Sequence, residues 1–468
     1  MNYTILPKKN YIPTLFYRQE QDKIQNSKMI EPIISHSIQH YYNDILSQLN
    51  QMKKNESVKK EYFEEIEKLM NHYELLFSKV SGSKFSISKL KPKNPVFYVY
   101  MELMYSNGIL DSLKNKNMNA LFFSSSGDVF IECMNILREE YKDNYTLNSS
   151  LSYKKNNLHF TNSGLIDFLY IELNNEENMN DSHDDYEYHN NYILNSLYGL
   201  CNTIICQRHK GITILKLDIL VHKPILEIIY LYTCLFEKVT IVKPISSNII
   251  TNERFLVCKN YNVETPLYDF FNKLTSYLKM NTTEYSLLNF DLPYFFLNKV
   301  EESNVSIGFQ QIEQIDLIMN IIKNKNREEK MENIKKSNIQ KCIQWCEKYK
   351  IPHNKFFDKG NIFLPENQKK KEENELFREN TMENTAPEIA RDEEIEENEE
   401  TEENEENEEN EENEENEENE DLEEENVEDF FLLHTESRIE LECYANRILE
   451  EQINMGIDEY LYEPSLYI

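Results

Sequence analysis

Between residues 94 and 265, short apolar runs typical of buried strands alternate with runs of helical periodicity. We predict strands at NALFF, LIDFLYIEL, GITILKLDI, EKVTIVK and RFLVCKN, and helices at VFYVYMELMYSNGIL, VFIECMNILREEY, YILNSLYGLCNTIICQRHK and KPILEIIYLYTCLF. Such alternation favours an α/β fold, in which helices cover both faces of a mostly parallel sheet. The last two strands are too close in sequence for a parallel crossover, so we expect an antiparallel pair at the edge of the sheet.

The sequence on both sides of this region has the periodicity of helices. In YFEEIEKLMNHYELLFSKV, for example, apolar residues recur at spacings of three and four. We therefore expect a helical N-terminal extension at residues 1–90, an α/β domain at 91–265 and a helical C-terminal extension at 266–360.

The negative charge of the chain is concentrated near its C-terminal end. Residues 392–429 hold 26 acidic side chains and no basic one, and without them the net charge changes from −33 to about −7. The repeated EEN triplets offer almost nothing to bury, so we expect residues 361–426 to be disordered and residues 427–468 to be helical. The acidic segment repels RNA phosphate, but it could bind a basic protein partner, imitate nucleic acid or act as a solubilising spacer.

The eight cysteines are scattered, and most lie in apolar runs such as TIIC, LYTC and FLVC. This pattern is typical of buried, reduced thiols and argues against a disulfide framework. The N-terminal run MNYTILPKKNYIPT has no apolar core of a secretory signal, and charged residues interrupt the long apolar run ILVHKPILEIIYLYTCLF. We expect a soluble protein in the cytoplasm, without a membrane partner.

Three charged side chains stand at or near the ends of predicted strands. Lys216 lies inside GITILKLDI, Glu172 ends LYIEL, and Glu253 precedes RFLVC. A buried lysine is rarely unpaired, because burial disfavours its charge and a nearby carboxylate restores it. The alternative, in which Lys216 extends to solvent at the strand end, stays open on the sequence alone.

A turn of small residues, Ser124 to Gly127, connects the strand NALFF to the next helix. A strand that ends in small residues before a helix allows a cofactor to approach the backbone, and the helix N-terminus favours hydrogen-bond acceptors. An ordinary strand-to-helix turn has the same composition, so this motif by itself decides nothing.

The segments GITILKLDI, EKVTIVKPISSNIITNERFLVCKN and, more weakly, KCIQWCEKYKIP resemble the FtsJ/RrmJ-type (adrift-like) ribose 2′-O-methyltransferases. They are most similar to the mRNA cap 2′-O-methyltransferases of large DNA viruses and eukaryotes. The resemblance implies a Rossmann-like, S-adenosylmethionine-dependent methyltransferase fold at residues 91–265. It also implies methyl transfer to RNA, with capped mRNA as the expected partner, in the cytoplasm of a host cell or in a viral factory.

The resemblance also assigns roles to residues. It implies that Lys216, Glu253 and Glu172 are catalytic, with Glu172 in the place of the family's aspartate. It implies that Ser124, Ser125, Ser126, Gly127 and Glu172 bind the cofactor, that Lys243, Ser246 and Ser247 contact RNA, and that no metal is needed.

Four positions depart from the family pattern. Val99 stands where the family has the first catalytic lysine, although Glu102 matches the acid that follows it. Asp128 replaces a glycine of the cofactor loop, and Asn248 replaces an arginine. Glu172 replaces the aspartate. Val99, Glu172 and Asp128 favour a second hypothesis, a catalytically silent fold that serves as an RNA-binding or scaffolding subunit.

Other candidate sites are weaker. Cys342, Cys346 and His353 lack a fourth zinc ligand at a usual spacing, and the cysteines fit the apolar face of a helix. His183 and His189 could bind a metal or lie in a solvated loop. Lysines of the linker SGSKFSISKLKPKNP could contact phosphate or be solvated; they are Lys84, Lys89, Lys91 and Lys93.

Overall fold

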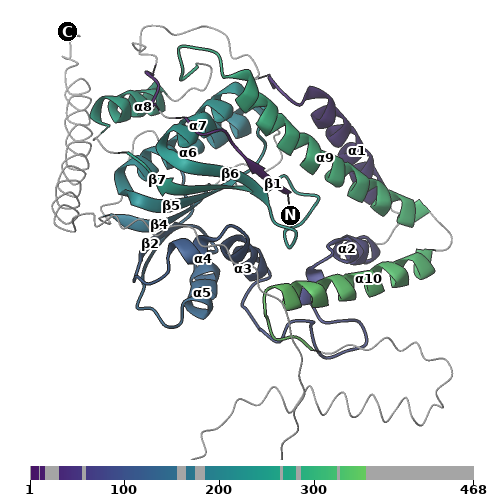
Figure 1. Cartoon of the computed structure of the whole chain (residues 1–468). Coiled ribbons are helices and arrows are strands. Elements are labelled where there is room, and N and C mark those ends of the chain that lie inside the picture. The colour runs from purple at the N-terminus through teal and green to yellow at the C-terminus, as the bar shows by residue number, and fades with distance from the viewer. Residues whose placement is uncertain are drawn as a thin grey trace, which may run out of the picture. The chain divides into compact units, whose positions relative to one another are not determined.

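The computed structural model describes residues 2–9, 11–15, 31–54, 60–154, 165–173, 185–263, 267–280, 286–323 and 327–354. Within them, seven strands form one sheet in the order β1-β6-β7-β5-β4-β2-β3 (Figure 1). The strands are β1 (Asn2–Ile5), β2 (Asn119–Phe123), β3 (Asn144–Asn148), β4 (Ile166–Glu172), β5 (Gln207–Leu217), β6 (Phe236–Lys243) and β7 (Arg254–Tyr261).

Most of the described strands share one direction. β3, β2, β4 and β5 pair in parallel, and β6 runs the same way because β7, between β5 and β6, is antiparallel to both. The prediction of an α/β fold with a mostly parallel sheet is therefore confirmed. The expected edge position of the antiparallel pair is wrong. β7 is an interior strand, and the antiparallel strand β1 covers the far side of β6.

Helices cover both faces of the sheet, and the alternation of side chains along β4 shows how. Phe168 and Tyr170 belong to one apolar cluster, which includes α3 (Val96–Ser106), α5 (Gly127–Leu137) and the end of α10 (Arg327–Lys348). Leu169 and Ile171 face the other cluster, which includes α6 (Asp185–Cys206), α7 (Lys223–Leu235) and α8 (Tyr268–Met280). Since successive side chains of a strand point to opposite faces, a strand between two such layers must be apolar throughout.

A third apolar cluster joins helices from the two ends of the chain. It contains residues of α1 (His36–Lys54), α2 (Lys60–Met70) and α9 (Tyr294–Lys323). The short elements η1 (Glu74–Leu76) and α4 (Ile109–Ser112) complete the described helices. Among the described residues, no helix is long and apolar enough to cross a membrane.

Three strands of the structure differ from what the sequence predicted. β1 lies within the expected helical extension 1–90, and β3 was not predicted, because NYTLN is short and half-exposed. β5 begins at Gln207, inside the run assigned to the preceding helix, which ends at Cys206. A Cβ on Gly211 would lie 1.8 Å from the side-chain nitrogen of Gln207, so the glycine makes room for this irregular start. The segments 361–426 and 427–468 lie outside the described residues.

Candidate active site

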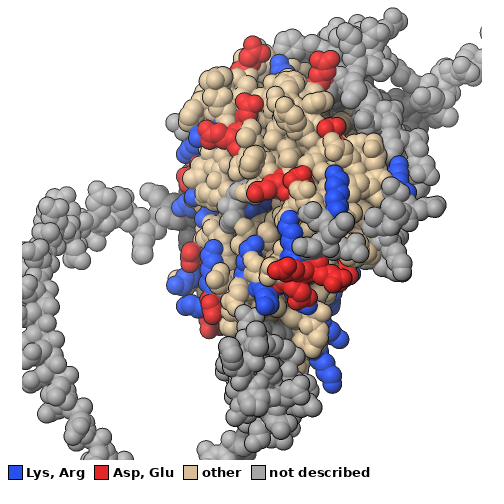
Figure 2. All heavy atoms as spheres, turned by 90° about the vertical axis from the view of Figure 1, so that its right-hand side faces the viewer, with Lys and Arg blue, Asp and Glu red and all other residues tan. Residues whose placement is uncertain are grey.

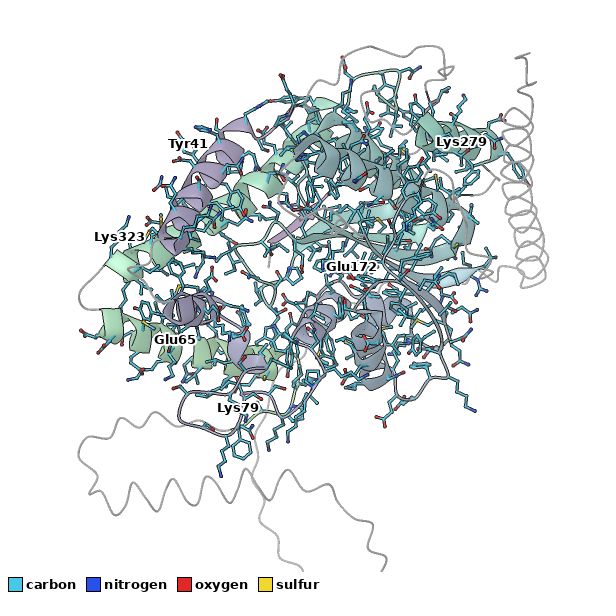
Figure 3. All side chains as sticks on the ribbon, turned by 180° about the vertical axis from the view of Figure 1, so that it is seen from behind. Tyr41, Glu65, Lys79, Glu172, Lys279 and Lys323 are labelled. Carbon is cyan, nitrogen blue, oxygen red and sulfur yellow. The ribbon has the colours of Figure 1, made fainter. Side chains whose placement is uncertain are left out.

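Three charged side chains from neighbouring strands meet at one end of the sheet. Glu172, which is labelled in Figure 3, is the last residue of β4 and is paired in register with Lys216 of β5. Lys216 Nζ lies 2.8 Å from Glu172 Oε1 and 3.4 Å from Glu253 Oε2. Glu253 immediately precedes β7, which pairs with the other side of β5. The register therefore places Lys216 between two carboxylates.

This arrangement keeps Lys216 charged. Burial alone would lower the pKa of Lys216, but Glu253 and Glu172 outweigh it and raise that pKa above its ordinary value of 10.5. For Glu172 the effects have the opposite signs. Burial alone would raise its pKa, but the charge and hydrogen bond of Lys216, together with the hydrogen bond of Ser124, outweigh burial and lower that pKa. Lys216 is 27% exposed, so this ammonium group can be reached from solvent.

The serine turn contacts the same carboxylate. Ser124 Oγ donates a hydrogen bond of 2.5 Å to Glu172 Oε2, and Ser125 Oγ lies 3.5 Å from the same oxygen. The backbone N–H of Ser126 donates to Ser124 Oγ at 3.1 Å. The turn is thus fixed by Glu172, while Ser125 remains exposed beside it.

Tyr100 of α3 extends this network, and the sequence did not identify it. Its hydroxyl lies 2.6 Å from Ser126 Oγ and 3.5 Å from the Tyr170 hydroxyl. Its ring stacks on Phe130, with 4.2 Å between the ring centroids. Tyr100 has no exposed surface, so it supports the turn from behind. The sequence held no distinct signal for Tyr100, because α3 also contains Tyr98 and Tyr105.

The strand order places these groups where open α/β sheets bind their ligands. From β2 the chain continues to β3 on one side and later returns through β4 on the other side of β2. In open α/β sheets, ligands bind in a crevice at the carboxyl ends of the strands where the order reverses. The turn Ser124 to Gly127 follows β2 and Glu172 ends β4, so both lie where this rule places the crevice.

Gly127 and Asp128 have separate roles in the turn. A Cβ on Gly127 would lie 2.3 Å from Leu147 Cδ1, so this glycine lets β3 pack against the start of α5. Asp128 is exposed, with its carboxylate 3.6 Å from Lys93 Nζ. Asp128 therefore faces solvent and does not fill the crevice.

The residues expected to contact RNA instead support the loop between β6 and β7. Lys243 Nζ donates to the carbonyl oxygens of Asn248 at 2.8 Å and Thr251 at 2.7 Å, and the side chain is buried. Ser247, also buried, donates to Pro244 O at 2.7 Å. Ser246 Oγ donates to Glu102 Oε2 at 2.6 Å. In this structure their polar atoms bind other parts of the protein.

The two neighbouring lysines differ in electrostatics. Burial lowers the pKa of Lys243 to about 7, and the opposing effect of Glu253 does not compensate. The partners of its ammonium group are carbonyl and hydroxyl oxygens, whereas Lys216 has two carboxylates. Direct ion pairing therefore decides which lysine remains charged.

The remaining candidate residues from the sequence are buried in the core or pack against other side chains. Val99 is buried in the apolar cluster of α3. Cys342 and Cys346 are buried in the same cluster, and Cys342 Sγ donates to His72 O at 3.4 Å. The ring of His189 lies 4.6 Å from that of His222. Among the described residues, no group of His, Cys, Asp and Glu could hold a metal. His183 lies outside them.

No protein-family model matches the chain, and no curated protein matches it either.

Proposed function

We propose that this protein transfers a methyl group from S-adenosylmethionine to a ribose 2′-hydroxyl of RNA, with capped mRNA as the substrate. The observation that carries the proposal is the position of Lys216 between Glu172 and Glu253, next to the serine turn. The reversal of strand order between β3 and β4 supports a Rossmann-like fold, in which the cofactor would lie at the same crevice.

The groups at the crevice fit S-adenosylmethionine. Ser125 Oγ is exposed, Asn148 ends β3, and the first turn of α5 offers backbone N–H groups. These donors suit the hydroxyl and carboxylate oxygens of an adenosyl amino acid, and Asp128 leaves the turn open. When bound, the cofactor supplies an electrophilic methyl carbon.

Lys216 holds the reacting oxygen. Because its pKa is raised, it acts as an ammonium group that stabilises the charge developing on the 2′-oxygen. The O–C bond forms while the S–C bond breaks, and the hydroxyl proton leaves to a carboxylate oxygen of Glu253 or to water. Glu172 and Glu253 keep Lys216 charged and oriented, so much of the rate gain comes from positioning.

A lysine-rich segment leads away from the crevice and supports an RNA partner. Residues 75–101 contain five lysines and no acidic residue. Lys93 contacts the first turn of α5, and the backbone N–H of Lys89 donates to Pro352 O, next to the exposed Lys348 and Lys350. Figure 2 shows that Lys and Arg are most frequent on the lower half of one face, at the height of α2 and α10 in Figure 1, with a group of Asp and Glu among them.

Calorimetric titration of the full chain with S-adenosylmethionine tests the proposal. We expect binding that Ser125→Trp removes by filling the crevice, while Lys79→Met, at an exposed lysine away from the turn, leaves it unchanged. Absence of heat at millimolar cofactor, with the protein folded by circular dichroism, would contradict the enzyme proposal.

One observation favours a second function, a silent methyltransferase-like subunit that binds RNA. Val99, in the place of the family's first lysine, is buried among apolar side chains, so the site lacks that cation. RNA binding without cofactor binding would support this second function.

A further inference from the structure

The loop that carries Glu253 is held by α9, a helix outside the sheet. The two N–H groups of Gln311 Nε2, in α9, are shared among three acceptors: Ile250 O at 3.1 Å, Thr251 O at 2.9 Å and Asn252 Oδ1 at 3.0 Å. The Gln311 side chain is almost fully buried. A buried amide is stable only if it is hydrogen-bonded, and this one binds three consecutive residues that precede Glu253.

A second residue of α9 fixes the other side of Glu253. Arg254 is buried, and its guanidinium donates to Asn304 Oδ1 at 2.6 Å. Asn304 in turn donates to Leu220 O at 2.8 Å, in the segment after β5. Asn304 and Gln311 are seven residues apart, so they lie on one face of the helix. α9 thus binds the residues immediately before and after Glu253.

Other parts of the chain hold the same loop. The Tyr42 hydroxyl of α1 donates to Ile250 O at 3.0 Å. At the start of the loop, Glu102 of α3 accepts the backbone N–H groups of Ile245 and Ser246, each at 3.0 Å. The loop is therefore bound by α1, α3 and α9, while Glu253 itself is a quarter exposed and reaches Lys216 at 3.4 Å.

We propose that Gln311 and Asn304 are positioning residues, which set the distance between Glu253 and Lys216. The importance of this distance for catalysis rests on the proposed function of Lys216. The inference that α9 holds Glu253 near Lys216 does not depend on that function. Without the hydrogen bonds of Gln311, the loop would no longer be held in its position, and Glu253 would move away from the ammonium group of Lys216.

Competitive labelling of lysines with acetic anhydride, read by peptide mass spectrometry, tests the claim without any activity. Only the neutral amine reacts, so the dependence of the rate on pH reports the pKa of Lys216, and the rates at pH 8 are then compared between variants. We expect Gln311→Met to speed the labelling of Lys216 about tenfold, since losing an opposite charge at this range lowers a lysine pKa by about one unit.

The matched control is Gln314→Met. Gln314 is also buried in α9 and donates to Met70 O at 3.0 Å, so it holds α2 and not the loop. Its replacement should leave the labelling of Lys216 unchanged. Tyr42→Phe is a milder test if Gln311→Met does not fold, and it should speed the labelling about two- to threefold, as a partial pKa shift would.

Equal labelling rates in wild type, Gln311→Met and Tyr42→Phe would overturn the inference. Loss of methyl transfer is a separate readout: Gln311→Met should lower kcat while leaving the cofactor affinity unchanged. If no cofactor binds, the proposed function fails, but the labelling result still decides whether α9 positions Glu253.

Discussion

Lys216 and Glu172 occupy directly paired positions of two parallel strands, with 2.8 Å between Nζ and Oε1. The second carboxylate, Glu253, immediately precedes the antiparallel strand β7 on the other side of β5. A lysine with partners on both sides requires a strand on each side of β5, and these strands are β4 and β7. The pairing of β7 with β5 is therefore what assembles the site.

Replacing Lys216 by Met should destabilise the protein at neutral pH. Glu172 and Glu253 would then lie close together without the cation, and we expect a loss of about 1–3 kcal/mol in the free energy of unfolding. The lowered pKa of Glu172 means that its pairing contributes stability above the ordinary value of 4.5, and that this contribution is lost as pH falls. Urea unfolding from pH 6 down to pH 2 should show this loss below pH 4.5 in wild type and not in Lys216→Met.

The stability of the protein should rise with pH above neutrality because of Lys243. Its pKa is about 7 in the fold and 10.5 as the ordinary value, so the unfolded chain binds more protons between these pH values. This group should add roughly 1.4 kcal/mol per pH unit in that window. Urea unfolding at pH 7, 8 and 9 should show a smaller slope for Lys243→Met than for wild type. An unchanged slope would show that Lys243 does not titrate there, and the exposed Lys79→Met serves as control.

The turn glycine should tolerate a methyl group only if Leu147 moves. Gly127→Ala should cost only about 0.5–1.5 kcal/mol, because the new Cβ would overlap Leu147 Cδ1, the end of an exposed side chain that can turn away. The double variant Gly127→Ala/Leu147→Ala should recover part of this loss. Chemical denaturation of the single and double variants measures the coupling, and simple additivity of the two changes would contradict direct contact.

The lysine segment should contribute to RNA affinity through charge alone. Lys91→Gln and Lys93→Gln should each weaken the binding of a capped oligoribonucleotide and reduce the slope of log K against log salt concentration by about 0.7–1. Lys323→Gln, at the end of α9, is a control that should change neither value. Fluorescence anisotropy at several salt concentrations measures both, and a slope equal to that of wild type would place the RNA elsewhere.

The sequence predicted most of the sheet because alternating periodicity follows local rules, and it identified β2, β4, β5, β6 and β7. The residues around Lys216 left open whether its side chain is paired or extends to solvent, and only the family resemblance linked it to Glu172 and Glu253. β1 and β3 were missed, since a polar run of four or five residues has too little periodicity. Nothing in the sequence around Lys243 tells whether its side chain turns outward or into its own loop.

The sequence also did not predict that α9 holds the loop of Glu253, because this contact joins distant parts of the chain. Gln311 and Glu253 are far apart in sequence, and their relation depends on how α9 packs against the sheet. Polar residues on the buried face of a helix were the only available signal. They indicate that a partner exists, but they do not identify it.

The most direct test of the account is transfer of a tritium-labelled methyl group from S-adenosylmethionine to capped RNA by the full chain, followed by nuclease digestion. We predict label in ribose 2′-O-methylated nucleotides, and a decrease of at least a hundredfold in Lys216→Met with unchanged cofactor affinity. If folded wild-type protein binds both the cofactor and RNA but transfers no label, or if Lys216→Met transfers as fast as wild type, the proposed role of Lys216 is wrong.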